Sequence, residues 1–344
     1  MPTPGYEAQA RARQTQLTKP PGSLGRLEDI ACWFAGRLGA VAPRMPQCGI
    51  YVFAGDHGVA QRGVSAFPQS VTAQMLANFA AGGAAINVLA ELSGVPVEIV
   101  NVGVLGDSAT PQGVRDRRVK AGTNDLSEGP AMTVAERDQA LAVGEQCARD
   151  GIEGGARLLI AGDMGIGNTT SAACLICALS NATPEQVVGR GTGVDDEAFA
   201  RKREIVKIAL ARIGPVNQKS ALEILGEVGG LEIAAMAGFY IQAARMQVPV
   251  LLDGFISTAA ALVAVGIDPS VRDWMLASHR SAETGHVVAL AFLEMQPILD
   301  LNLRLGEGSG AALALPIVRA ALSLHRDMAT FEQAGVATAV GESR

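Results

Sequence analysis

The stretch that decides the fold is ARLLIAGDMGIGNTTSAA, residues 156–173. Its apolar first part predicts a buried strand, and its alanine-rich end opens a helical pattern. The loop between them carries three glycines that let backbone N–H groups converge, and three polar residues that can cap the helix: Gly162, Gly165, Gly167, Asn168, Thr169 and Thr170. A strand, a glycine loop and a helix N-terminus in this order favour a bound phosphate, although a simple tight turn has the same pattern. No GxGxxG and no loop lysine are present, which argues against a dinucleotide fold or a P-loop NTPase.

The same strand pattern recurs along the chain at wide intervals. Six short, continuously apolar runs are Gly49–Ala54, Val95–Val102, Arg157–Ala161, Val248–Asp253, Trp274–Ala277 and Ile298–Leu303. Alanine-rich segments of helical period separate most of them, as in right-handed βαβ crossovers. The sequence therefore predicts an α/β fold with about six parallel strands and helices on the faces of the sheet.

Polar residues and glycines follow nearly every predicted strand. They are Gly55–Gly58, Gly103, Gly162–Asp163, Gly254–Phe255, Ser278–Ser281 and Arg304–Ser309. Because ligands of parallel sheets bind beyond the carboxyl ends of the strands, this clustering predicts one shared active site.

The two ends of the chain read as helical and lack strands. Residues 1–36 are broken by Pro20-Pro21-Gly22, and the segment from Leu315 onward predicts one or two helices with Pro316 in the first turn. We expect residues 1–40 and 315–344 to form a small helical domain, and residues 41–314 to form the large α/β domain.

Composition excludes several classes of protein. The 344 residues carry a formal charge of -6 and 49% hydrophobic residues, without a basic run, so nucleic acid is not an expected partner. Five cysteines without a regular framework, and an N-terminus lacking a signal-peptide core, predict a reducing cytoplasm. The apolar run Phe255–Ile267 is too short to span a membrane, so no membrane partner is expected.

Cys174 and Cys177 form a CxxC within a helical pattern, where buried thiols are more common than a metal or redox site.

Six motifs in one order resemble the nicotinate-nucleotide:5,6-dimethylbenzimidazole phosphoribosyltransferase family of cobalamin biosynthesis. They are TKPPGSLGRLE (18–28), FAGDHGVAQRGVSAFPQSVTAQM (53–75), GDMGIGNTTSAA (162–173), GRGTGVDD (189–196), SHRSAETGH (278–286) and LNLRLGEGSGAALA (301–314). The resemblance implies a Rossmann-like large domain with six parallel strands and a small helical domain built from both termini. It also implies a homodimer whose substrate cavity is completed by the neighbour's small domain.

The resemblance implies transfer of phosphoribose from nicotinate mononucleotide to 5,6-dimethylbenzimidazole, giving α-ribazole 5'-phosphate and nicotinate with inversion at the anomeric carbon. Because the pyridinium is already a good leaving group, neither a cofactor nor a metal is expected. Two alternatives remain open at this point. One is a phosphoribosyltransferase of the same fold that uses adenine or a phenol, and the other is a non-catalytic base or nucleotide sensor.

By resemblance, the catalytic base is Glu307, although an acidic residue at this position could instead cap the helix that follows. The substrate-binding residues implied are Asp163, Gly165, Ile166, Gly167, Asn168, Thr169, Gly191, Lys202, Ser278, Ser65, Phe67, Pro68, Gln74 and Leu305. Phe67 and Pro68 offer an apolar wall for the base, and Gln69 or Gln74 offers an amide. Asp163 stands where the family usually has glutamate, which shortens the reach of the carboxyl group by one methylene.

Histidines near the predicted site also fit other chemistry. The spacing of His279 and His286 would allow one helix face, but no third ligand is evident, so metal catalysis is not expected. The pair Asp56-His57 fits either a hydrogen-bonded turn or a substrate contact.

Overall fold

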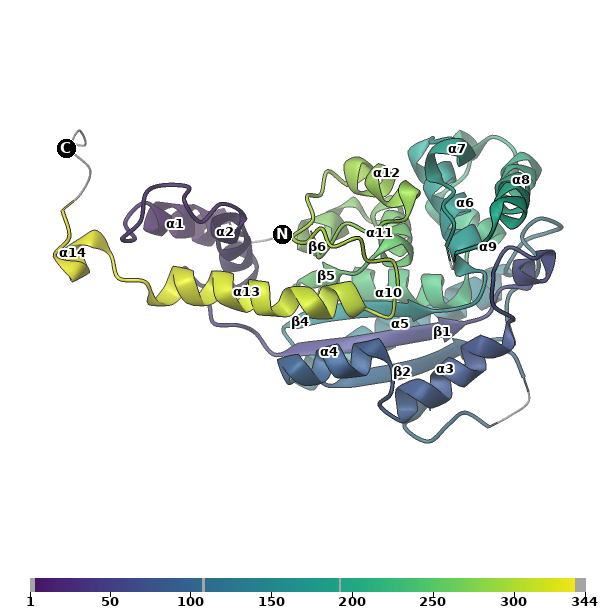
Figure 1. Cartoon of the computed structure of the whole chain (residues 1–344), viewed down its shortest axis with the longest axis horizontal. Helices are drawn as coiled ribbons and strands as arrows, with labels where there is room; N and C mark the ends of the chain where they lie inside the picture. The colour runs from purple at the N-terminus through teal and green to yellow at the C-terminus, as the bar shows by residue number, and fades with distance from the viewer. Residues whose placement is uncertain (1–3, 107–108, 192, 338–344) are drawn as a thin grey trace. The chain divides into compact units, whose positions relative to one another are not determined.

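The computed structural model describes residues 4–106, 109–191 and 193–337. The chain divides into two compact units (Figure 1). One unit is Cys48–Leu313, and the other combines the two chain ends, up to Gln47 and from Ala314. That these units correspond to separate folding domains stays a prediction.

The large unit is built on one parallel sheet of six strands. These are β1 (Cys48–Gly55), β2 (Val97–Gly103), β3 (Val114–Asp116), β4 (Leu158–Met164), β5 (Val250–Leu252) and β6 (Met275–Ala277). Their order is β3-β2-β1-β4-β5-β6, and every neighbouring pair is parallel. The order in which strands are added reverses between β1 and β4, which is the switch point where ligands bind in Rossmann-like folds. The predicted fold class is confirmed.

One predicted strand is wrong. The run Ile298–Leu303 forms no strand and makes only an isolated bridge between Leu299 and His279. Asn302 in this run has a φ of +55°, which interrupts the extended conformation. The sixth strand is instead β3, a three-residue edge strand whose partly exposed, charged sequence VRD does not read as a buried strand.

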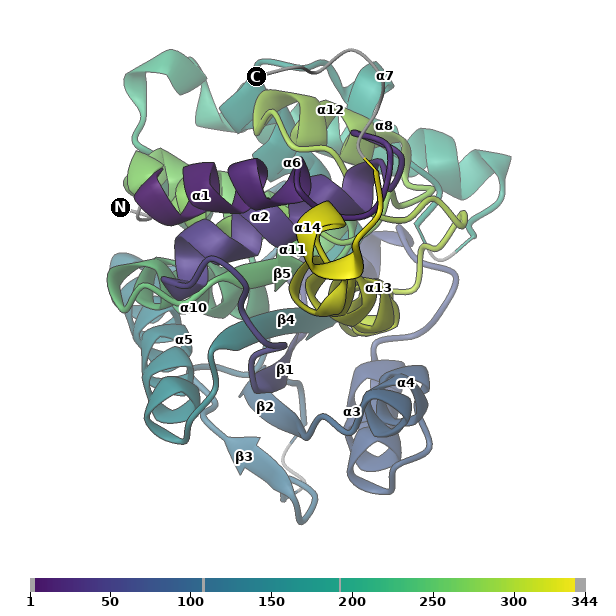
Figure 2. The same cartoon turned by 90° about the vertical axis from the view of Figure 1, so that its left-hand side faces the viewer.

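Helices cover both faces of the sheet. On one face α10 (Leu231–Arg245) packs against β1, β2 and β4, with α5 (Val134–Glu153) lying on α10. On the opposite face α3 (Ser70–Ala80) and α4 (Ala85–Ser93) contact β2, as Figure 2 shows. The remaining helices of this unit are η1 (Gly58–Arg62), α6 (Asn168–Ser180), α7 (Pro184–Val187), α8 (Asp196–Ile213), η2 (Val216–Gln218), α9 (Ala221–Val228), α11 (Phe255–Ile267), η3 (Pro269–Trp274) and α12 (Thr284–Phe292).

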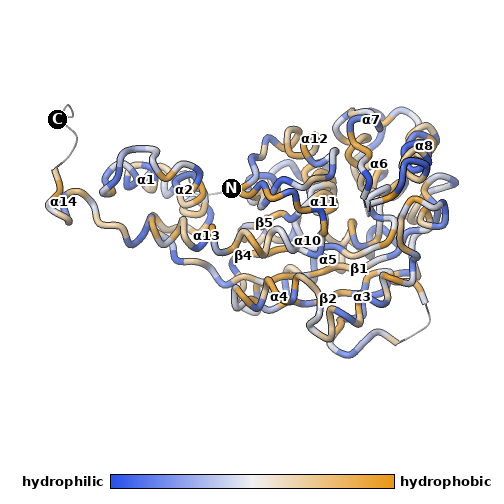
Figure 3. The backbone as a smooth tube through the Cα atoms, in the orientation of Figure 1, coloured by the Kyte–Doolittle hydropathy of each residue, from blue (hydrophilic) through white to orange (hydrophobic). Residues whose placement is uncertain are grey.

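The core lies between the sheet and α10. Hydrophobic residues run along β1, β2 and α10, whereas α8 is largely hydrophilic (Figure 3). Phe239 on α10 packs its ring 5.1 Å from that of Tyr51 and 5.5 Å from that of Phe53, both on β1. Burial of such rings is the main favourable term in folding, so the strand positions that carry the site are held by a rigid core.

By length and composition alone, the stretch Ser70–Ser93 would suffice to cross a membrane, and 28% of the 18-residue window that meets this test is buried. It is not one helix but two, since α3 ends at Ala80 and α4 begins at Ala85.

The terminal unit joins the two ends of the chain. It contains α1 (Pro4–Gln14), α2 (Arg26–Leu38), the end of α13 (Ser309–Asp327) and α14 (Phe331–Ala334). Leu17 pairs with Thr330 in an antiparallel bridge, and the Phe331 N–H donates to the Gln16 carbonyl at 2.9 Å. The break at Pro20-Pro21-Gly22 is confirmed, because α1 and α2 lie on either side of it. Pro316 is not in the first turn as expected but inside α13, which begins seven residues earlier.

Candidate active site

The glycine loop joins β4 to α6 at the carboxyl end of the sheet. A Cβ on Gly165 would lie 2.2 Å from the Gly55 carbonyl oxygen, so only glycine lets the loop approach β1 this closely. Gly167 is the N-cap of α6 with a φ of +97° and no side-chain capping bond. Asn168, Thr169 and Thr170 therefore do not cap the helix, as the sequence suggested, but form its first turn. The N-terminus of α6, where the helix dipole favours an anion, carries Asn168 and Thr169 at the wall of a cavity.

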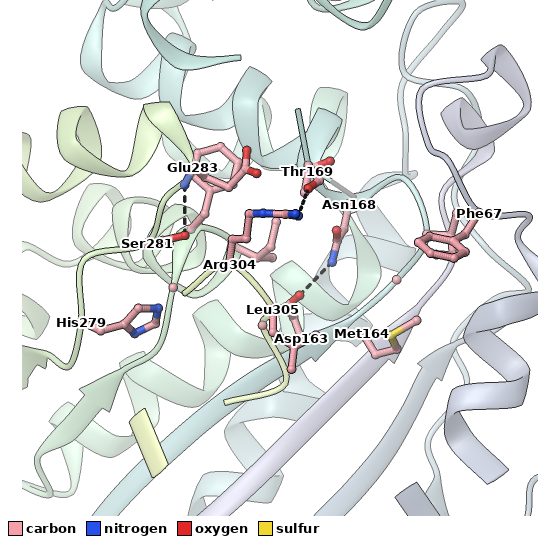
Figure 4. Close-up of a pocket in the computed structure, with 17 residues that line it drawn as sticks. Phe67, Asp163, Met164, Asn168, Thr169, His279, Ser281, Glu283, Arg304 and Leu305 are labelled. Atoms are coloured by element: carbon pink, nitrogen blue, oxygen red, sulfur yellow. Dashed lines mark hydrogen bonds between the residues drawn. The ribbon is translucent and has the colours of Figure 1, made fainter. Parts of the chain in front are cut away.

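This cavity has a volume of about 240 Å³ and is shown in Figure 4. It is lined by Phe67, Asp163–Ile166, Asn168, Thr169, Gly191, Gly254–Ile256, His279, Ser281, Glu283 and Arg304–Gly306. These residues come from the ends of different strands, so the sheet edge gathers them as the sequence predicted.

Two cationic side chains stand at the glycine loop. Lys202 on α8 is only 1% exposed, and its Nζ donates to Thr169 Oγ1 at 2.8 Å and to the Gly189 carbonyl at 3.2 Å. Burial lowers the pKa of Lys202 to about 8, while the charge of Glu283 raises it in part. Arg304 donates from Nη1 to the Gly191 carbonyl at 2.9 Å and lines the cavity. The site is thus suited to a phosphate group at its glycine-loop end.

Glu307 lies on a tight loop next to the cavity. Gly306, Glu307 and Gly308 all have left-handed backbone, with φ of +88°, +63° and +83°. The loop packs on β4 so closely that a Cβ on Gly162 would lie 2.2 Å from the Glu307 carbonyl carbon. Glu307 does not cap α13; its carboxylate accepts a hydrogen bond from the Ile86 N–H at 3.4 Å, at the N-terminus of α4.

The surroundings of Glu307 make its carboxylate a stronger base than an exposed glutamate. Burial raises its pKa above the usual range; the Ile86 N–H lowers the pKa, and the charge of Asp253 raises it further. A raised pKa makes a carboxylate a stronger base, provided that the pKa stays below the working pH.

Asp163 is the acidic residue of the glycine loop. Its Oδ2 accepts from Asn168 Nδ2 at 2.9 Å, and the pair faces the cavity in Figure 4. Burial raises the pKa of Asp163 well above its usual range, and the nearby charges of Asp253 and Glu232 act in the same direction. These surroundings therefore favour the protonated form of the Asp163 carboxyl.

The histidines of the predicted site have structural partners. Thr258 Oγ1 donates to the Gly254 carbonyl at 2.8 Å, so the His286 Nε2–H donates to that hydroxyl at 2.9 Å. His286 Nδ1 accepts from the Ser281 N–H at 2.8 Å, and burial lowers the pKa of His286 to about 3. His286 is therefore neutral and holds the loop that carries Ser281 into the cavity.

Asp56 and His57 are fully buried and hydrogen-bonded. Asp56 accepts from Thr72 Oγ1 at 2.7 Å and from the Leu105 N–H at 2.9 Å. His57 Nε2 lies 2.7 Å from the Glu232 carboxylate. Neither residue lines the cavity, which favours the hydrogen-bonded turn over a substrate contact. Within the described ranges, no group of three His, Cys, Asp or Glu residues could hold a metal ion.

The structure brings together about half of the predicted site residues at the cavity wall: Asp163, Gly165, Ile166, Asn168, Thr169, Gly191, Phe67 and Leu305. Gly167, Lys202 and Glu307 lie just behind the wall, through the contacts given above. Ser278 is fully buried, with its hydroxyl 3.0 Å from His279 Nδ1. Ser65, Pro68 and Gln74 belong to the Phe67 segment but do not line the cavity; Gln74 is exposed, whereas Gln69 donates to the His57 carbonyl at 2.7 Å.

Four residues of the wall were expected near the cavity but were not assigned to substrate binding. They are His279, Ser281, Glu283 and Arg304, which lie after the fifth predicted strand and after the run 298–303. Their position after those segments was the available signal. Asp253, fully buried at the end of β5, was missed altogether; its two carboxylate oxygens accept from the N–H groups of Gly308 and Ala311 at 3.1 and 3.0 Å.

Comparisons with known proteins give a consistent result. A phosphoribosyltransferase family model matches residues 1–336. The chain is 56% identical over 328 residues to a nicotinate-nucleotide–dimethylbenzimidazole phosphoribosyltransferase of Chromobacterium violaceum, covering 95% of this chain and 94% of the relative. It is 52% identical over 336 residues to the protein of that name from Mycobacterium avium, covering 97% and 96%. A crystal structure of that phosphoribosyltransferase from Thermus thermophilus superposes with a TM-score of 0.93 at 47% identity, covering 98% of this chain and 100% of the other.

Proposed function

This chain belongs to the nicotinate-nucleotide–dimethylbenzimidazole phosphoribosyltransferase family, and we propose that it transfers phosphoribose from nicotinate mononucleotide to 5,6-dimethylbenzimidazole. The products are α-ribazole 5'-phosphate, a precursor of the lower ligand of cobalamin, and nicotinate. The observation that carries the proposal is the position of Glu307 on the same sheet edge as the glycine loop, where its N–H donates to the Asp163 carbonyl at 3.2 Å.

The proposed reaction begins with the 5'-phosphate at the N-terminus of α6, beside Lys202 and Arg304. This contact fixes C1' of the sugar for attack. One ring nitrogen of the benzimidazole forms a bond to C1' as the bond from C1' to the nicotinate nitrogen breaks, and the electron pair leaves with nicotinate. The proton on the other benzimidazole nitrogen passes to the Glu307 carboxylate.

Replacing Glu307 by Gln tests the role of the base. We expect kcat to fall roughly 10²- to 10⁴-fold, the usual contribution of a general base, with KM for nicotinate mononucleotide largely kept. Release of nicotinate measures the rate. Glu91→Gln, a change of an exposed glutamate on α4, is the matched control and should keep full activity. An unchanged kcat in Glu307→Gln would remove the residue from this role.

The two alternatives are not favoured. The relatives carry dimethylbenzimidazole in their names, and none of those reported above is named for adenine or a phenol. A screen of the three acceptors with nicotinate mononucleotide tests the base preference directly. Tight binding of both substrates without nicotinate release would instead indicate a sensor.

We also propose that the protein is a cytoplasmic homodimer. All five cysteines are buried free thiols, which suits a reducing compartment. Light scattering after gel filtration should give twice the 35.5 kDa mass of the chain. A mass of one chain at concentrations where the enzyme is active would contradict the dimer.

A further inference from the structure

Glu283 is a cavity residue whose side chain has an unused hydrogen-bond acceptor. It precedes α12, is 6% exposed, and forms no side-chain bond that would cap the helix. Among the described residues, its buried Oε2 has no hydrogen-bond partner. The oxygen lies against the backbone of the loop before α8, since a Cβ on Gly189 would be 2.1 Å from it. Because Oε2 is enclosed by protein, a donor that arrives with the substrate would meet Oε1, to which no described residue donates a hydrogen bond either. A largely buried carboxylate without a donor is costly, so this arrangement points to a donor on the substrate.

Neither cationic side chain of the site donates a hydrogen bond to the Glu283 carboxylate. Lys202 Nζ is directed to Thr169 Oγ1 and the Gly189 carbonyl, and Arg304 donates to the Gly191 carbonyl. In Figure 4, the Glu283 carboxylate lies at the same end of the cavity as Arg304 and Thr169. A phosphate held there cannot be the partner of Glu283, because two anionic groups repel each other.

The chemistry of the substrates leaves one class of donor. In nicotinate mononucleotide the dianionic phosphate, the main form above about pH 6, and the nicotinate carboxylate accept hydrogen bonds, and the quaternary pyridinium nitrogen has no proton. The 2'- and 3'-hydroxyls of the ribose are the donors. Dimethylbenzimidazole has one N–H, which the proposed mechanism directs to Glu307.

We infer that Glu283 accepts a hydrogen bond from a ribose hydroxyl of the nucleotide and so selects ribotides over deoxyribotides. The inference rests on the proposed function and adds a specificity residue to it. Asp163 is the competing carboxyl at the cavity, but its Oδ2 already accepts from Asn168, and its surroundings favour the protonated form.

A chemical double-mutant cycle tests the inference. kcat/KM is measured for wild type and Glu283→Ala with nicotinate mononucleotide and with its 2'-deoxy and 3'-deoxy analogues. A hydrogen bond to a charged group predicts a loss of about 10- to 100-fold in Glu283→Ala with the ribotide. With the analogue that lacks the bonded hydroxyl, the same substitution should cost less than about threefold. Comparing the two enzymes on one substrate cancels the intrinsic reactivity of each sugar.

Two further variants distinguish recognition of the hydroxyl from a structural role of Glu283. Glu283→Gln keeps an acceptor oxygen and should lose less than Glu283→Ala, which a purely structural role of the charge does not predict. A parallel cycle on Asp163→Asn should show no such coupling. If Glu283→Ala does not fold, Glu283→Gln takes its place in the cycle, and its loss should again be smaller on the analogue that lacks the bonded hydroxyl.

Equal losses on all three substrates, or coupling at Asp163 instead, would each overturn the inference while leaving the proposed transfer intact. An absence of wild-type turnover with every substrate would instead overturn the proposed function, and the inference with it.

Discussion

Lys202 shows how burial tunes a single residue of the site. An exposed lysine keeps its charge far above neutral pH, whereas the pKa of Lys202 falls to about 8 because the side chain is desolvated. Its two hydrogen bonds fix Nζ between Thr169 and Gly189, beside the N-terminus of α6. A phosphate at this point would stabilise the charged form, so binding and protonation are coupled.

We predict that nicotinate mononucleotide binds more weakly as the pH rises above about 8, because the unliganded enzyme then loses the ammonium charge. The dissociation constant, measured by calorimetry, should be nearly flat below this pH and approach a tenfold rise per pH unit above it. Lys202→Met should bind more weakly at neutral pH and lack this rise. The same alkaline rise in Lys202→Met would show that another group is responsible.

At the scale of elements, the start of α13 is held by the end of β5. Asp253 accepts the N–H groups of Gly308 and Ala311, and thereby caps α13 and fixes the left-handed loop that carries Glu307. His279 Nδ1 lies 3.8 Å from the same carboxylate. The left-handed backbone at Glu307 is unfavourable for a residue with a side chain, and the hydrogen bonds to Asp253 hold the loop in this conformation.

Asp253→Asn places an amide NH₂ where one of the two carboxylate oxygens accepted an N–H. We expect a loss of roughly 1–3 kcal/mol of stability, the cost of an unpaired buried donor. We also expect a lower kcat with an unchanged KM for nicotinate mononucleotide, since the Glu307 loop is released while the glycine loop is not. Denaturant titration and steady-state kinetics measure the two effects.

Asp268→Asn is a matched control, because Asp268 caps η3 at a partly exposed position and asparagine caps equally well. That variant should change neither stability nor rate noticeably. A wild-type kcat in a folded Asp253→Asn protein would show that the loop does not need this cap.

At the scale of the whole molecule, His325 joins the two ends of the chain within the terminal unit. It is 1% exposed, with Nδ1 2.8 Å from Gln14 Nε2 and Nε2 2.8 Å from the Val41 carbonyl. The amide donates to Nδ1, so Nε2 carries the proton that is donated to Val41. The Gln14 bond needs a neutral ring, because Nδ1 accepts in it, whereas Nε2–H can donate to Val41 in either protonation state. Burial lowers the pKa of His325 below its usual value, although the Val41 bond raises it in part.

His325→Leu should destabilise the terminal unit by roughly 1–3 kcal/mol near pH 7.5, because the Val41 carbonyl and the Gln14 amide lose their partner. The wild-type contribution is present above the unfolded pKa of about 6.5 and is lost as the pH falls toward the lower folded pKa. The difference between the two proteins should therefore shrink at pH 5.5. Fluorescence of Trp33 in α2, in a Trp274→Phe background, reports on this unit. An unchanged difference at both pH values would contradict a lowered pKa of His325 in the folded protein.

Local signals in the sequence were sufficient for most of the architecture. Five of the six strands lie where apolar runs of four to eight residues predicted them, and the break at Pro20-Pro21-Gly22 separates α1 from α2. These signals work because strand, turn and helix preferences act over a few neighbouring residues. They fail at β3, whose edge position depends on pairing with β2, and at Ile298–Leu303, where Asn302 turns the backbone.

The sequence by itself determined the parallel α/β fold, the glycine loop, the glycine-flanked Glu307 and the family. Only the tertiary structure decided that Asp253 caps the Glu307 loop, that Lys202 is buried against Thr169, and that Glu283 keeps an unpaired oxygen at the cavity. The physical reason is that each of these features joins groups far apart in the chain. Their hydrogen bonds and pKa values depend on shared desolvation, which no local pattern encodes.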